Sequence, residues 1–196
     1  MAVQRSFPTL NELHCAPVDD DGFLTNPDDI LQWFHGTFQL DMSRPNGRPP
    51  HVAVENGALV IDGDVRWRDG MWDATKRGMA GLFSARIGRL DGSLLLVGAE
   101  DRLTSLEGLP ERITGHLSCY AQPRLVSLAG GPRIVSGDIR VNNCGLVGCQ
   151  GGPMEVGGEF DVSNNKIKSL SGGPSVVGSM NASGNLLADL TGGPQT

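Results

Sequence analysis

Aromatic side chains are scarce in this chain: they make up 5% of its 196 residues, with one tyrosine and three tryptophans. Basic residues are not in excess either, since 16 lysines and arginines stand against 22 acids and the formal net charge is −6. The first deficit argues against one large aromatic core, and the second against electrostatic binding to nucleic acid or an anionic membrane. The acidity is concentrated in residues 1–64, which hold ten acids and three bases.

Long apolar runs are missing as well. No stretch approaches the roughly 20 apolar residues of a membrane span, and residues 1–20 have no continuous apolar segment of the kind that a signal peptide needs. We therefore expect a soluble protein of the cytoplasm that does not contact membranes.

Patterns that would indicate catalysis or metal binding also fail. The recurring Gly-Gly-Pro triplets are not followed by the lysine and hydroxyl residue of a phosphate loop. The acidic run at residues 19–22 does not fit a calcium loop, because Pro17 falls where a carboxylate is required. The four histidines show neither a ligand spacing with the four cysteines nor a paired carboxylate. We predict a protein that is not an enzyme and that has no metal site and no cofactor.

What the chain does have is glycine and a repeat. Four Gly-Gly-Pro triplets end at Pro132, Pro153, Pro174 and Pro194, at intervals of 21, 21 and 20 residues. An altered copy ends at Pro110, 22 residues before the first triplet. A period of about 20 to 25 residues is typical of a solenoid, in which one supersecondary unit stacks on the next.

Each repeat contains one short stretch that alternates apolar and polar residues, as a strand does. Six such strands should lie parallel in one sheet, and their first inward residues are Val65, Leu94, Leu117, Ile139, Phe160 and Met180. Four more apolar columns share the period: Trp67, Leu96, Cys119, Val141, Val162 and Ala182; Leu103, Leu125, Leu146, Ile167 and Leu187; Leu106, Leu128, Cys149, Leu170 and Leu190; Leu90, Ile113, Val135, Val156 and Val177. Five columns per turn would close a coil around a dry interior.

The N-terminal part is different. Thr25 or Asn26 can cap a helix that starts at Pro27, and a hairpin is expected within residues 52–61 around Asn56-Gly57. We predict a mainly β protein: a small N-terminal α+β cap over residues 1–62, followed by a parallel β-solenoid of about six coils over residues 63–196. Residues 68–81 lengthen the first coil and should form a loop.

The repeat carries a family resemblance. Residues 160–167, Phe-Asp-Val-Ser-Asn-Asn-Lys-Ile, resemble the core of a leucine-rich repeat. Residues 165–174, Asn-Lys-Ile-Lys-Ser-Leu-Ser-Gly-Gly-Pro, are similar to a short variant that is common in bacteriophage and prophage genomes, whose first strand often reads Gly-Asp-Val as residues 63–65 do here. The resemblance covers residues 52–196 and implies a solenoid of leucine-rich-repeat type that serves as a display scaffold.

One column should be polar and buried. Asn165 and Asn185 occupy it, and Cys144 replaces asparagine in the preceding coil. An amide held inside the turn can pair main-chain groups of adjacent coils that lack other partners. Cys119 and Cys149 fall in apolar columns, so we expect these three cysteines to be buried and reduced.

The outward strand positions form the candidate binding surface, a varied polar face unlike the uniform basic stripe that nucleic acid requires. Its three rows are Asp64, Ser93, His116, Asp138, Glu159 and Ser179; Arg66, Leu95, Ser118, Arg140, Asp161 and Asn181; and Arg68, Val97, Tyr120, Asn142, Ser163 and Ser183. The residues we assign to partner binding are Arg66, Arg68, Trp72, His116, Tyr120, Asp138, Arg140, Asn142, Glu159, Asp161 and Asn181. Trp72 and Met71 lie in the 68–81 loop, either tucked against the helix or exposed for contact.

The resemblance implies a protein partner from the host or the phage, and host cytoplasm as the location. Inhibition of a host defence factor is one version of this role. The other version is a structural or assembly protein that uses the same face or the open end of the solenoid. At that end either a second copy covers the last coil, giving a homodimer joined through the C-terminal coils, or the coil remains exposed.

Overall fold

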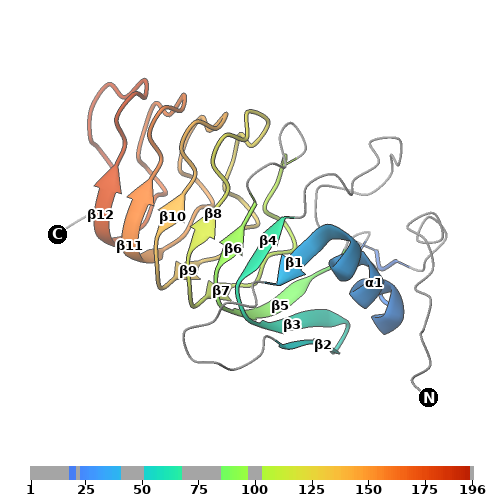
Figure 1. The fold of residues 1–196 in the computed structure, drawn as a ribbon. Helices are drawn as coiled ribbons and strands as arrows, with labels where there is room; N and C mark the ends of the chain where they lie inside the picture. Colours follow the sequence, from blue (N-terminus) through green and yellow to red (C-terminus); the bar gives the residue numbers. More distant parts are fainter. Residues whose placement is uncertain (1–17, 21–22, 41–50, 68–84, 97–102, 195–196) are drawn as a thin grey trace, which may run out of the picture.

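The computed structural model describes residues 18–20, 23–40, 51–67, 85–96 and 103–194. Within these ranges the chain is mainly β and winds into a parallel β-solenoid of about four turns, with one short helix near the N-terminus. The coils stack along one axis, with helix α1 at one end of the stack and strand β12 at the other (Figure 1). The predicted fold class is confirmed.

The helix, α1 (Pro27–Thr37), begins where the sequence predicts. Asn26 is its N-cap: the side-chain Oδ1 accepts the main-chain N–H of Asp28 at 2.9 Å and of Asp29 at 3.3 Å. These two bonds satisfy donors that the first turn of a helix leaves without partners, and the two carboxylates lie at the positive end of the helix dipole.

One side of α1 is buried against the start of the sheet. Ile30, Trp33 and Phe34 are each at most 2% exposed. They pack where α1 contacts strands β1 (Phe38–Leu40), β2 (His51–Glu55) and β3 (Ala58–Asp62). The helix therefore covers the apolar end of the first coils, as we expected for a cap.

Strands β2 and β3 form the predicted hairpin, with His51 paired to Asp62 and Glu55 to Ala58. Its turn residues, Asn56 and Gly57, both have positive φ values of 51° and 75°. A two-residue turn of this kind matches the twist of the strands, and asparagine followed by glycine adopts it at little cost. Strand β3 also pairs in parallel with β5 (Ile87–Asp91), so the hairpin continues directly into the solenoid.

The predicted sheet is present and is called the first wall here. Its strands, in spatial order, are β4 (Val65–Trp67), β6 (Leu94–Leu95), β8 (Leu117–Ser118), β10 (Ile139–Arg140) and the C-terminal parts of β11 (Glu155–Asp161) and β12 (Val176–Asn181). All pair in parallel, and the partner residues are those of the predicted first column, from Val65 opposite Leu94 to Phe160 opposite Met180. Strand β1 closes the N-terminal edge by pairing antiparallel with β4.

A second row of strands, the second wall, lies along another side of the coils. It consists of β3, β5, β7 (Arg112–Ile113), β9 (Ile134–Val135) and the N-terminal parts of β11 and β12. The sequence indicated only its inward column, Leu90, Ile113, Val135, Val156 and Val177, and not that these residues form strands. Strand β11 is long enough to belong to both walls, which it joins between β10 and β9.

The interior is built as the five columns predict. Every described column member is buried in the four coils that contain Leu94, Leu117, Ile139 and Phe160, and these four side chains are at most 1% exposed. Burial of a large apolar side chain stabilises the fold by about 1.5–3 kcal/mol, and each coil buries its side chains only against its neighbours. The side chain of Trp67 lies outside the described residues, and so do Met71 and Trp72.

Burial ends at the last coil. Val177, Met180, Ala182 and Leu187 are only partly buried, and Leu190 is 75% exposed. Leu186 and Val176 on the same coil are each 60% exposed. This gradient is the one that the sequence predicts for a final coil with a single apolar neighbour.

The polar column inside the coils does what we expected of it. Asn165 Oδ1 accepts the N–H of Cys144 and of Leu146, both at 3.1 Å. Its Nδ2 donates to the carbonyls of Val141 at 2.9 Å and Val162 at 2.8 Å. Asn165 thus pairs main-chain groups of its own coil and the one before, all inside a buried turn.

The same position is filled differently in each coil. Asn185 repeats the asparagine pattern, with Oδ1 3.0 Å from the Ile167 nitrogen and Nδ2 2.9 Å from the Val162 carbonyl. Cys144 directs its Sγ to the Cys119 carbonyl at 3.2 Å. Gln122 donates to the Leu96 carbonyl at 3.2 Å and is 1% exposed. It was not among the residues predicted for this column. Each of the four lies three residues after the second-column residue of its coil.

The residue before each of these positions has a left-handed backbone. Ala121, Asn143, Asn164 and Gly184 have φ values of 57°, 55°, 54° and 67°. Glycine and asparagine tolerate this region, whereas alanine pays a steric cost there. The Gly-Gly-Pro corners also have positive φ at their first glycine, as at Gly130 (78°), which is the role we expected of these glycines.

Candidate binding face

The outward side chains of the first wall stand in rows because adjacent strands pair in register. Arg66, Leu95, Ser118, Arg140, Asp161 and Asn181 are consecutive Cα partners along β4, β6, β8, β10, β11 and β12. Neighbouring strands lie about 4.8 Å apart, so this row is a straight line of side chains across the sheet. It is called the middle row here.

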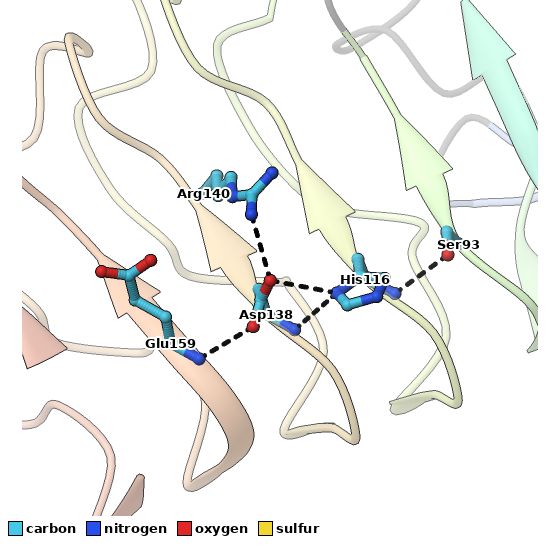
Figure 2. Close-up of polar contacts among 5 residues, drawn as sticks. All are labelled: Ser93, His116, Asp138, Arg140 and Glu159. Atoms are coloured by element: carbon cyan, nitrogen blue, oxygen red, sulfur yellow. Dashed lines mark hydrogen bonds and ion pairs between the residues drawn. The ribbon is translucent and has the colours of Figure 1, made fainter. Parts of the chain in front are cut away.

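The row on the N-terminal side of the strands forms a hydrogen-bonded ladder (Figure 2). Each of its first four side chains accepts the main-chain N–H of the equivalent residue in the next coil. Asp64 Oδ1 accepts from Ser93 at 2.6 Å, Ser93 Oγ from His116 at 3.1 Å, His116 Nδ1 from Asp138 at 2.8 Å and Asp138 Oδ1 from Glu159 at 2.9 Å. These residues therefore join the coils to one another as well as facing solvent.

The ladder uses one ring nitrogen of His116 as a hydrogen-bond acceptor. Its Nδ1 lies 2.8 Å from the Asp138 nitrogen and 3.4 Å from Asp138 Oδ2. The shorter contact is to a main-chain donor, so Nδ1 is the acceptor in this hydrogen bond. An ion pair through Nδ1 would need the opposite arrangement.

Asp138 is the centre of this cluster. While its Oδ1 accepts the Glu159 N–H, its Oδ2 lies 3.2 Å from an Arg140 guanidinium nitrogen. Arg140 is exposed over about half of its side chain, so solvent screens the pair and its contribution to stability is small. The pair does orient Arg140 along the face, as Figure 2 shows.

The remaining members of the middle row differ in exposure, and Ser118, Asp161 and Asn181 are half-buried. Arg66 is exposed, and Leu95 is 39% exposed. Asp161 Oδ1 accepts the N–H of Ser163 at 3.0 Å, and Asn181 Oδ1 accepts that of Ser183 at 3.2 Å. Asp161 and Asn181 thus each form a short local turn at the end of their strand.

The third row was predicted correctly in part. Tyr120 is 37% exposed and Asn142 is half-buried. Ser163 was predicted to face outward, and this was wrong: it is 5% exposed. It lies two residues beyond the end of β11, where the chain bends into the left-handed Asn164, and its short side chain is covered there. Strand alternation no longer applies outside a strand.

The structure brings nine of the eleven predicted partner-binding residues onto one wall: Arg66, His116, Tyr120, Asp138, Arg140, Asn142, Glu159, Asp161 and Asn181. Arg68 and Trp72 lie outside the described residues. Binding itself stays a prediction for all eleven.

The side chains that could act as nucleophiles are held in hydrogen bonds or buried. Ser93 Oγ accepts a main-chain N–H, and its partner is not the imidazole of His116. Burial raises the pKa of the Cys144 and Cys149 thiols to about 11, and it raises the pKa of Cys119 further, with the neighbouring Cys144 adding to the effect. These three cysteines are free and buried, as predicted. In the described ranges no three histidine, cysteine or acidic side chains lie close enough to hold a metal ion.

A hollow near the start of the second-wall strands was not predicted from the sequence. It has a volume of about 530 Å³ and is lined by two pairs of corner glycines and by Leu109, Glu111, Arg133 and Met154. Glu111, Arg133 and Met154 hold equivalent positions near the start of the second-wall strands. The sequence signal for this hollow is the residue that follows each Gly-Gly-Pro triplet, because Arg133 and Met154 occupy that position in successive coils and line the hollow.

The fold of this chain is a parallel β-solenoid with a helix that caps its N-terminal end and a polar face along its first wall. No helix in the described part of the chain is long and apolar enough to cross a membrane. Comparison with family models, with curated proteins and with solved structures finds no match to this chain.

Proposed function

We propose that this chain is a non-catalytic scaffold that binds a protein through the first wall. In this proposal it is encoded by a phage or prophage, acts in the host cytoplasm and inhibits a host protein such as a defence factor. The origin and the host target rest on the resemblance of residues 160–174 to the short repeats of phage and prophage proteins.

The observation that carries the binding role is the composition of the face. Arg66 and Leu95 are exposed on the adjacent strands β4 and β6, and Tyr120 is exposed just beyond the end of the next strand, β8. Arginine and tyrosine are the residue types that most often dominate interface energetics. The hydrogen-bonded ladder in the neighbouring row holds the strands in register. These side chains therefore project from a rigid support, which lowers the conformational entropy lost on binding.

A capture experiment tests this role. The tagged protein is mixed with bacterial lysate, and the captured proteins are compared between wild type and a Tyr120→Ala/Arg66→Glu variant. The matched control is Arg112→Glu, which changes an exposed arginine on the second wall. We expect a captured host protein that the face variant loses and the control keeps. Equal capture by both variants would place binding elsewhere.

The second candidate is a structural or assembly protein that associates through the open end of the solenoid. It is favoured by the exposed apolar side chains of the last coil, Val176, Leu186 and Leu190. Among the described residues β12 pairs only with β11, and an unpaired strand edge promotes association. Sedimentation at micromolar concentration would show a dimer that Leu190→Glu dissociates. Mass spectrometry of purified virions would contain the protein if it is a structural component.

A further inference from the structure

Charged side chains of the first wall form an ion pair in the middle of the wall but not at its two ends. In the middle, Asp138 forms an ion pair with Arg140. At the N-terminal end, Arg66 forms no ion pair among the described residues, and the nearby Asp64 accepts the main-chain N–H of Ser93. At the other end, neither Glu159 nor Asp161 contacts a cation there, since Asp161 accepts only the N–H of Ser163.

The two ends are a fixed distance apart. Arg66 on β4 and Asp161 on β11 belong to the same row, separated by four strand-to-strand steps. At about 4.8 Å per step their Cα atoms lie about 19 Å apart. Glu159 and Asp161 are two residues apart on one strand and therefore point to the same side.

Between the ends the face is apolar in part. Leu95 follows Arg66 in the row, and Tyr120 lies two residues after Ser118, the next member. Both are more than a third exposed. The face thus presents a cation, then two apolar side chains, then the satisfied Asp138–Arg140 pair, and then two carboxylates.

We propose that this face binds an extended segment of another protein that runs across the strands and carries an acidic residue over Arg66, apolar residues over Leu95 and Tyr120, and a basic residue over Glu159 and Asp161. This inference rests on the proposed function and specifies its partner. A separation of about 19 Å corresponds to about six residues of extended chain. Complementary charges at the two ends also fix the direction in which the segment lies.

Nucleic acid fits this surface poorly. A phosphate backbone repeats negative charge at every step, so the part that passes Glu159 and Asp161 would meet two carboxylates without cations beside them. A uniformly basic segment would fit those carboxylates but would place like charge over Arg66. The separation of the charges therefore favours a segment whose own charges are separated.

The test is a selection from a random 12-residue peptide library on three forms of the full chain. Wild type should enrich peptides with an acid and a base about six residues apart and apolar residues between them. Arg66→Glu should replace the selected acid by a base, and Glu159→Lys should replace the selected base by an acid. Neither side chain makes a hydrogen bond among the described residues, so both variants should fold; unchanged thermal midpoints would verify this.

Arg112→Glu on the second wall is the matched control and should enrich the same peptides as wild type. For one enriched peptide, Arg66→Gln should weaken binding by about two- to fivefold, the range for exposed ion pairs. Enrichment of uniformly basic or uniformly acidic peptides, or of sequences that none of the changes alters, would overturn this inference. Capture of a host protein lost on Tyr120→Ala would then still support the proposed function. Failure of both experiments would overturn the proposed function as well.

Discussion

Replacing Asn165 by leucine should be among the most damaging single changes in this protein. Leucine has the same number and branching of side-chain heavy atoms but no polar atoms, so the N–H groups of Cys144 and Leu146 lose the acceptor that each contacts at 3.1 Å. The Val141 carbonyl loses the donor at 2.9 Å. The Val162 carbonyl keeps a partner, because Asn185 Nδ2 also donates to it at 2.9 Å.

Three buried main-chain groups are therefore left unpaired. Each costs about 1–3 kcal/mol, and partial relaxation brings the expected total to about 3–5 kcal/mol. Folded domains are stable by about 5–15 kcal/mol, so this variant should be close to unfolding at moderate temperature. Asn165→Cys should lose less, because the cysteine at the equivalent position, Cys144, donates to the Cys119 carbonyl.

The matched control is Asn185→Leu in the last coil. There Oδ1 accepts one N–H, that of Ile167, and the side chain is only partly buried, so we expect a loss of about 1–2 kcal/mol. Urea denaturation followed by circular dichroism measures both. A loss below about 1 kcal/mol for Asn165→Leu, or equal losses for the two variants, would refute this account of the polar column.

Three further predictions concern the interior and the turns. Phe160→Ala and Ile139→Ala should each cost about 2–5 kcal/mol in urea denaturation, while the outward Asp161→Asn should cost under about 0.5 kcal/mol; equal midpoints would contradict the assigned directions. Cys119, Cys144 and Cys149 should resist thiol reagents in the native state. Burial raises the folded-state pKa of Cys144 and Cys149 from 9.0 to about 11. The contribution of these protonated thiols to the free energy of unfolding should therefore be complete below pH 9 and lost as the pH rises toward 11. A urea midpoint that holds or rises between pH 9 and 11 would count against this prediction. Ala121→Gly should raise stability by about 0.5–1 kcal/mol, since Ala121 has a φ of 57°, and a lower thermal midpoint would argue against strain at this position.

The interior was predictable because its signal is repeated. An apolar residue that recurs every 20 to 23 residues identifies a column even when each strand has only two residues, as β8 and β10 do. The second wall was recognised as a column but not as strands. Two-residue strands such as β7 and β9 are too short to show alternation, and they are defined by pairing with neighbouring coils.

The face was predictable in position but not in its internal contacts. The sequence placed Asp64, Ser93, His116 and Asp138 in one outward row, yet their bonds to main-chain N–H groups of the next coil depend on the register between coils. Gln122 was missed because glutamine is one methylene longer than the asparagine that the resemblance leads one to expect. Counting three residues on from Cys119 would have found it.

Side-chain footprinting of the complex tests the central claim most directly. Hydroxyl radicals would be applied to the protein alone and bound to the host protein captured from lysate. We predict protection of Tyr120, Leu95 and His116 on the first wall, with Met154 and Ile134 on the second wall oxidised equally in both states. Protection of Met154 and Ile134 with Tyr120 and Leu95 unchanged would contradict binding through the first wall.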